Sequence, residues 1–302
     1  MALINVGASL PAPMWAVIRL LAFLKKAVPL DQARALLTPP SLSSKAGARD
    51  RTFDEAISTL RDLGLILVQD EGTALVLAGE ARDVDGQDLD AFTSALRSAV
   101  FAPERNSGLG ETDDPTGPRD LTRALAWFLS LDPMGHPVHG DIVQNMQKNA
   151  LKSEVGPAIV NDVRWNRFGF WAPALGLAAP PTVPSAGKRP LTPDCTMAVR
   201  QVVQGRWKPG ERVKAVEAVA AVREQLPVLP GGAYSRVLGI AGPGQTAAGA
   251  ALSFALLRGH DEGWLRLERD ADARRMLQVI DPEQPSSPRS VSDLVILEAP
   301  RG

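Results

Sequence analysis

The sequence predicts a mainly α-helical protein with short β-hairpins, an α+β fold, and the stretch around Gly64 is the first observation behind this prediction. Residues 52–63 carry apolar side chains at i, i+4 and i+7, which predicts an amphipathic helix packed through Phe53, Ile57 and Leu60. Gly64 then ends the helix, because glycine adopts the left-handed conformation at the lowest cost. The short apolar runs 65–68 and 74–77 surround a polar turn and predict a hairpin. Helix, glycine stop and hairpin follow one another in this order in a winged-helix domain.

The second observation is that this order returns later in the chain. Residues 246–257 predict a helix of mostly small side chains, and Glu262-Gly263-Trp264-Leu265 repeats the glycine stop and strand entry. A weaker copy lies at 160–174, with Gly176 as its stop. Because the spacing between the copies is irregular, the sequence predicts tandem winged-helix domains rather than a solenoid.

Proline and glycine residues separate the remaining predicted helices and divide the chain into domains. Further helices are expected at 14–24, 31–37, 90–101, 121–131 and 212–226. A linker rich in Gly, Asp, Thr and Pro covers 106–118. We therefore expect an N-terminal winged-helix domain with an extra helix, a middle helical domain that we interpret as a degenerate winged helix, and a C-terminal helical or winged-helix domain, at residues 1–105, 119–190 and 191–302.

Composition and hydropathy limit the cellular compartments in which we expect the protein. The single cysteine, Cys195, excludes an internal disulfide framework and suits a reducing compartment. The apolar stretch 14–24 is too short to span a bilayer, and charged residues interrupt it, so it resembles neither an anchor nor a cleavable signal. We expect a cytoplasmic protein without a membrane partner.

The distribution of charge suggests where a nucleic acid would bind. Residues 119–258 contain 16 Lys and Arg against 9 Asp and Glu, whereas residues 86–118 contain 2 against 6. Affinity for nucleic acid comes largely from neutralising phosphates, so the middle of the chain is the expected contact surface. The alternative is an ordinary solvated face with a local excess of positive charge.

Two groups of basic residues are candidates for DNA contact. The first group lies in and before the predicted recognition helix: Arg49, Arg51 and Arg61. Arginine matches both phosphate and guanine edges, but four carboxylates in the same segment, those of Asp50, Asp54, Glu55 and Asp62, would repel a DNA backbone. This winged helix could therefore bind protein instead.

The second group lies in the middle segment, where Arg164 and Arg167 are interleaved with aromatic residues and the basic pair Lys188 and Arg189 occupies a proline-rich loop. Such a pattern can pair with phosphates while aromatic rings stack on bases. The spacing i, i+3 and i+6 favours a core role for Trp165, Phe168 and Trp171. The arginines remain available in either case.

The residues argue against catalysis. Gly239 to Thr246 has the spacing of a phosphate-binding P-loop, but Gln245 replaces the lysine, so we interpret the segment as a loop in which Thr246 caps the next helix. His136, His139 and Cys195 are too few and too widely spaced for a zinc site. No nucleophile motif surrounds Cys195. We expect no enzyme activity, no metal and no cofactor.

Three short segments carry a resemblance to a known family. They are Pro193-Asp194-Cys195-Thr196-Met197-Ala198-Val199, Leu226-Pro227-Val228-Leu229-Pro230-Gly231-Gly232 and Ala251-Leu252-Ser253-Phe254-Ala255-Leu256-Leu257. Together they resemble DpdG, a family from the bacterial dpd gene clusters, which insert 7-deazaguanine bases into DNA and restrict foreign DNA. The resemblance implies a cytoplasmic, helical, non-enzymatic component that works beside helicase, nuclease and base-exchange subunits. It assigns no site residues.

Two hypotheses of function follow from the sequence. In the first, the chain is a DNA-binding or adaptor subunit of a bacterial DNA-modification and antiphage defence system, and DNA and other subunits are its partners. In the second, its winged helices dimerise or dock protein partners, as in kite-type scaffold subunits. A winged-helix transcriptional regulator is the third alternative.

Overall fold

The computed structural model describes residues 2–5, 7–39, 51–69, 72–111, 117–147, 150–151, 155–183, 187–284 and 286–298. The chain forms two compact units. Unit 1 comprises Met1–Ser107 and Pro115–Leu121, and unit 2 comprises Gly108–Asp114 and Thr122–Gly302. The predicted boundary near residue 190 lies inside unit 2, and the division of that unit into two domains stays a prediction.

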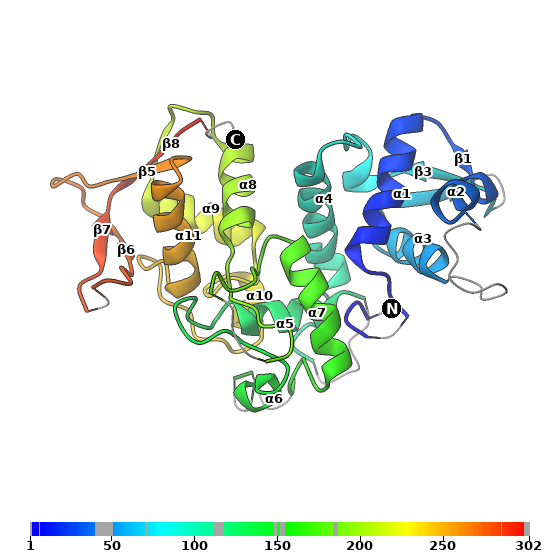
Figure 1. Ribbon diagram of the computed structural model, residues 1–302. Helices are drawn as coiled ribbons and strands as arrows, with labels where there is room; N and C mark the ends of the chain where they lie inside the picture. The colour runs from blue at the N-terminus through cyan, green and yellow to red at the C-terminus, as the bar shows by residue number, and fades with distance from the viewer. Residues whose placement is uncertain are drawn as a thin grey trace. The chain divides into compact units, whose positions relative to one another are not determined.

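Unit 1 contains a three-stranded antiparallel sheet with helices packed against it (Figure 1). Its helices and strands are α1 (Pro11–Leu24), β1 (Val28–Pro29), α2 (Leu30–Leu37), α3 (Thr52–Asp62), β2 (Ile66–Gln69), β3 (Ala74–Leu77) and α4 (Leu89–Phe101). The strand order is β1-β3-β2. The mixed α and β content confirms the α+β class.

The prediction for residues 52–77 is confirmed. Phe53, Ile57 and Leu60 of α3 are buried, because they share one face of the helix. Gly64 follows the helix with a φ of 68°, a conformation that favours glycine. Strands β2 and β3 then pair antiparallel, with Ile66 opposite Leu77.

The first part of unit 2 is helical. Helix α5 (Arg119–Phe128) continues into unit 2 from unit 1, and α6 (Val143–Met146) and α7 (Asp162–Ala174) follow it. Gly176, with a φ of 70°, follows α7 as predicted. In the described residues that come next, the chain forms isolated bridges, such as the one between Ala179 and Thr192, and not a hairpin like that of unit 1.

The second part of unit 2 has an element order similar to that of unit 1, with an additional short helix and an additional hairpin. Its elements are α8 (Thr196–Arg206), β4 (Arg212–Lys214), α9 (Ala215–Gln225), α10 (Ala233–Val237), α11 (Ala250–Asp261), β5 (Leu265–Glu268), β6 (Leu277–Val279), β7 (Arg289–Val291) and β8 (Asp293–Ile296). The sheet order β4-β8-β5 places the last strand between the first and the second, as in β1-β3-β2. The extra hairpin β6–β7 lies between β5 and β8 in the chain (Figure 1), and its first strand contacts α11, where the Ile280 amide donates to Ser253 Oγ at 2.9 Å.

Two predicted helix boundaries in this part are wrong. The helix expected from residue 212 begins at Ala215, because Arg212 to Lys214 form a strand that pairs with β8. The helix expected from residue 246 begins at Ala250, because Gly249 before it has a φ of 80°, outside the helical range. The sequence pattern does not mark these two helix starts, because residues 212–214 alternate in polarity and residues 246–249 are small.

None of the described helices combines the length and the apolar character that a bilayer crossing demands.

Candidate nucleic-acid interface

Helix α7 carries half of the predicted middle site, and its burial pattern explains how its arginines are placed. The side chain of Asn161 caps the helix by accepting a hydrogen bond from the Arg164 amide at 2.9 Å. Trp165, Phe168 and Trp171 are at most 1% exposed, which confirms their predicted core role. Phe168 of α7 packs edge-on against Phe128 of α5, with the ring centroids 5.2 Å apart.

Arg164 and Arg167 directly precede Trp165 and Phe168 of this buried stripe. Successive residues of an α-helix are rotated by about 100°, so the two arginines are separated by roughly 60° around the helix axis. Both side chains are half-buried. Arg164 donates a hydrogen bond from Nη1 to the carbonyl oxygen of Ala158 at 3.2 Å. The sequence prediction that the two lie on neighbouring positions is therefore confirmed.

Lys188 packs on another part of the helix, and two carboxylates neutralise it. Its Nζ lies 2.9 Å from Asp162 Oδ2 and 3.7 Å from Asp141 Oδ1. The hydrogen bond and the charge of Asp162 raise the pKa of Lys188 above its ordinary value, and the charge of Asp141 adds to the effect. A hydrogen bond from the Lys188 amide in turn holds the pKa of Asp141 below its ordinary value. Lys188 therefore lies on the middle segment as predicted, but the carboxylates of Asp141 and Asp162 already compensate its positive charge.

Arg189 lies across α7 in an unusual backbone conformation. Its φ of 48° falls in the left-handed region, which residues other than glycine seldom adopt. Its guanidinium carbon lies 3.9 Å from the ring centroid of Phe170, a cation–π contact. Gly169 makes this path possible, because a Cβ at that position would lie 2.2 Å from Arg189 Cδ.

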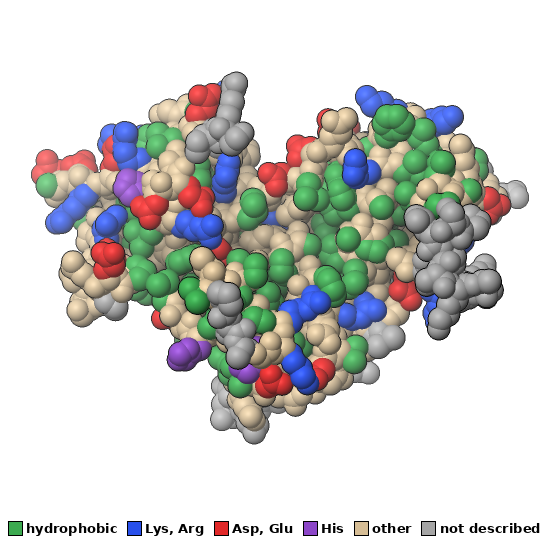
Figure 2. All heavy atoms as spheres, in the orientation of Figure 1, with side chains coloured by type: hydrophobic (Ala, Val, Ile, Leu, Met, Phe, Trp, Pro, Cys, Tyr) green, Lys and Arg blue, Asp and Glu red, His purple; other side chains and the backbone are tan. Residues whose placement is uncertain are grey.

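The four predicted residues of the middle site therefore do not form one cluster. Asp162 and Gly169, which contact Lys188 and Arg189, are rotated by roughly 140° to 160° from Arg164 around α7. Basic and acidic side chains lie next to one another in the region of the surface where α7 runs (Figure 2). The basic residues flank the buried aromatic stripe on two sides, so a DNA backbone would meet them as separate contacts.

The arginines of unit 1 have acidic surroundings. Arg51 is exposed and directly precedes α3, and Arg61 is exposed in its last turn, where Nε lies 3.9 Å from Asp62 Oδ1. Arg49 lies outside the described residues. Glu55 and Asp54 occupy the first turn of the same helix. Asp54 pairs with Arg34 of α2, so its charge is compensated, whereas Asp62 lies next to Arg61.

Three residues that shape the middle site were not identified as site residues from the sequence. Asp141 and Asp162 bind Lys188, and Phe170 lies under Arg189. Phe170 falls outside the i, i+3, i+6 spacing of the buried aromatic rings, which is a signal of exposure that the sequence does contain. The carboxylate contacts join residues 47 and 26 positions apart, and no local pattern predicts such pairs.

The P-loop-like segment is arranged differently from a phosphate site. The buried Arg223 donates hydrogen bonds to the carbonyl oxygens of Gly244, Ala247 and Ala248, at 3.4, 2.8 and 3.1 Å. A phosphate would need amide N–H groups, which point opposite to carbonyls. The predicted cap is also wrong, because Gly249, and not Thr246, is the N-cap of α11.

The histidines and the cysteine have separate surroundings. His139 Nδ1 lies 3.2 Å from Asp141 Oδ2, whereas Cys195 is buried and its Sγ lies 3.5 Å from the Ala251 carbonyl oxygen. Burial raises the pKa of the Cys195 thiol well above its usual range. Among the residues that the structure describes, no group of three or more His, Cys, Asp and Glu could hold a metal ion.

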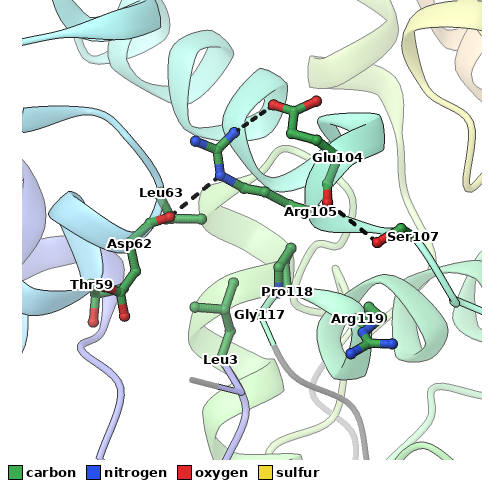
Figure 3. Close-up of a pocket in the computed structure, with 10 residues that line it drawn as sticks. All are labelled: Leu3, Thr59, Asp62, Leu63, Glu104, Arg105, Ser107, Gly117, Pro118 and Arg119. Atoms are coloured by element: carbon green, nitrogen blue, oxygen red, sulfur yellow. Dashed lines mark hydrogen bonds and ion pairs between the residues drawn. The ribbon is translucent and has the colours of Figure 1, made fainter. Parts of the chain in front are cut away.

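A small pocket in unit 1 has mixed charge (Figure 3). It encloses about 220 Å³ between the end of α3, the turn after α4 and the start of α5. Arg105 lies in its wall with Nη1 3.1 Å from Glu104 Oε1, and its Nε donates to the Asp62 carbonyl oxygen at 3.4 Å. Acidic and basic groups thus pair within the wall, and the pocket has no single charge that would select a ligand.

Comparison with known proteins agrees with the resemblance found in the sequence. A model of the DpdG-like family matches residues 1–273, a range that includes all three of the segments that carry the resemblance. Neither the curated proteins nor the solved structures contain a match. Because the family model covers most of its length, the chain belongs to the DpdG-like family.

Proposed function

We propose that this chain is a non-enzymatic DNA-binding or adaptor subunit of a dpd-type DNA-modification and defence system, acting in the bacterial cytoplasm beside other subunits. Family membership supports the link to a multi-subunit dpd system. The observation that carries the DNA-binding part is the repeated topology. Both sheets have the order first, third, second strand, and in each a helix, a strand and further helices precede the two strands that complete the sheet. This is the element order of a winged helix, a DNA-reading version of the helix-turn-helix, so we interpret both as winged-helix domains.

The surface that we assign to DNA consists of the arginines on two sides of α7. Arg164, Arg167 and Arg189 lie within the segment of excess positive charge, and an arginine fork suits phosphate oxygens. Lys188 contributes less, because Asp141 and Asp162 compensate its charge. Arg51 and Arg61 also contribute less, because α3 carries carboxylates on the same side.

The non-enzymatic part of the proposal rests on the three candidate reactive groups. The P-loop-like segment turns carbonyl oxygens toward Arg223, the Cys195 thiol is buried with a raised pKa, and His139 pairs with a carboxylate away from Cys195. A nucleophile needs an accessible, activated atom with a base beside it. These groups support a binding role rather than a chemical one.

Replacing Arg164, Arg167 and Arg189 together by alanine is expected to weaken binding to duplex DNA for all sequences alike. Each lost phosphate contact should flatten the dependence of log affinity on log salt by about one unit, so the triple variant should lose up to about three units. Fluorescence anisotropy with labelled duplexes over a range of salt concentrations measures both quantities.

The matched control for this variant removes the same charge from unit 1. Arg51, Arg61 and Arg82 are exposed, and their joint replacement by alanine should change the salt dependence much less. Equal losses in the two triple variants would mean that net charge alone governs binding, and the assignment of α7 would be wrong.

Removing the two carboxylates that pair with Lys188 should strengthen DNA binding, in contrast to the loss of the arginines. In the double variant Asp141→Asn, Asp162→Asn, the ammonium group loses both carboxylates, so duplex binding should tighten several-fold and its salt dependence should steepen by roughly one unit. Asp261→Asn with Glu283→Gln removes two exposed carboxylates elsewhere in unit 2 and serves as the control. If both double variants bind alike, Lys188 does not face the DNA.

A protein-docking role is the second candidate, because unit 1 has an exposed apolar surface at the end of α1. Phe23 in the last turn of α1 is 80% exposed, and with Ala16, Leu20 and Leu37 it lines a groove of about 740 Å³. Exposed apolar patches of this kind mark interaction sites in soluble proteins. Other subunits of the system or a second copy of the chain could occupy it, as in kite-type scaffolds, and a regulator that dimerises in this way is the remaining alternative.

A further inference from the structure

Phe170, which is exposed, and Arg189, which is half-buried, form an aromatic and cationic platform on α7. The Phe170 side chain is 44% exposed, whereas Trp165, Phe168 and Trp171 on the same helix are at most 1% exposed. The guanidinium of Arg189 lies over the ring, with its central carbon 3.9 Å from the ring centroid. A planar cation stacked on a ring presents a flat, positively charged surface.

The platform is held in place by the residue that precedes Arg189. The carbonyl oxygen of Lys188 accepts hydrogen bonds from the Gly140 amide at 2.9 Å and from Trp165 Nε1 at 3.0 Å. The Lys188 amide donates to Asp141 Oδ2 at 3.3 Å. Because both backbone groups of Lys188 are bonded, the chain enters Arg189 from a fixed direction.

Two further features keep Arg189 over the ring. The residue retains a left-handed φ of 48°, which is a strained conformation for any side chain other than glycine. Gly169 leaves the space through which the arginine stem passes, since an added Cβ would lie 2.2 Å from Arg189 Cδ. A left-handed backbone at Arg189 and the open space at Gly169 thus accompany the stacked position of the guanidinium.

The chemistry of such a platform suits an unpaired nucleobase. Bases stack on aromatic rings and on guanidinium planes, and a cation at the same place can pair with the neighbouring phosphate. A base inside a duplex has both faces covered by its neighbours and cannot stack there. The platform therefore distinguishes unpaired bases from paired ones, whereas Arg164 and Arg167 meet only the backbone.

We propose that the Phe170–Arg189 platform binds an unpaired base of single-stranded DNA by stacking. This inference rests on the proposed DNA-binding function and adds to it a preference for unpaired strands at this place.

The test compares full-length variants on a labelled oligothymidine strand and on a duplex of equal length. Phe170→Leu keeps an apolar side chain but removes the ring on which the guanidinium of Arg189 lies, so the base should lose its stacking platform and affinity for the single strand should fall by about tenfold. Affinity for the duplex should change by less than about twofold, and the salt dependence should stay the same because no charge is lost. Arg189→Lys keeps the charge but not the plane, and should show the same selective loss.

Phe23→Leu is the matched control, since Phe23 is an exposed phenylalanine on α1 of unit 1 and is not part of the platform. It should bind both probes as the wild type does. If Phe170→Leu binds the single strand like the wild type, or loses affinity equally for both probes, the stacking inference is overturned while DNA binding stands. If the wild type binds neither probe in a salt-dependent way, both the proposed DNA-binding function and the stacking inference fail.

Discussion

Replacing Arg223 by alanine is expected to lower the free energy of unfolding of unit 2 by about 3 kcal/mol, because several carbonyl groups lose a charged donor. The side chain is 8% exposed and donates to Gly244, Ala247 and Ala248, and burial lowers the pKa of its guanidinium. These bonds hold the loop before α11. Urea unfolding followed by circular dichroism measures the change.

Arg236→Ala is the control for this prediction. Arg236 is exposed and its Nε donates to the Gly232 carbonyl oxygen at 3.3 Å, so its loss should cost no more than about 0.5 kcal/mol. A cost below about 1 kcal/mol for Arg223→Ala would show that water replaces the guanidinium and that the loop does not depend on it.

Asp120→Ala is expected to destabilise unit 1 by about 3 kcal/mol, since it leaves buried amides without an acceptor. The carboxylate is 1% exposed and accepts hydrogen bonds from the amides of Leu3 and Ile4, at 2.9 and 2.8 Å, and from Leu121 at 2.8 Å. Without it, residues 2–5 should lose their position. Amide hydrogen exchange at Leu3 and Ile4 reports this directly.

Two comparisons sharpen the test of Asp120. Asp132 is exposed and also accepts from a backbone amide, that of Met134, so Asp132→Ala should leave stability almost unchanged. Asp120→Asn keeps one acceptor oxygen and should fall between the wild type and the alanine variant. Unchanged exchange at Leu3 and Ile4 in Asp120→Ala would contradict the role given to the carboxylate.

The parts of the fold that the sequence predicts well are those with a local signal. Helix α3 and the hairpin after it follow from the change of periodicity at Gly64, and the core role of Trp165 follows from helical spacing. Strand β4 has three residues and exists because it pairs with β8, about 80 residues further on. No window of sequence contains that information.

In the candidate site, too, local features can be predicted from the sequence and tertiary contacts cannot. The types and approximate positions of Arg164 and Arg167 are readable from the sequence, because a helix places i and i+3 side by side. The compensation of Lys188 by Asp162 and the stacking of Arg189 on Phe170 are tertiary contacts. Gly169 is a position where sequence offers a hint, since a glycine inside a helical pattern costs about 1 kcal/mol and calls for a packing reason. The reason is the passage of Arg189.

The most direct test of the central claim, that this chain contacts DNA through its basic residues, is the binding of the wild-type protein to two duplexes of unrelated sequence over a range of salt concentrations. The account predicts that log affinity falls linearly with log salt, with a slope of about −3 or steeper, and that the slope is the same for both duplexes. Absence of salt-dependent binding at moderate ionic strength would contradict the account and favour docking of protein partners instead.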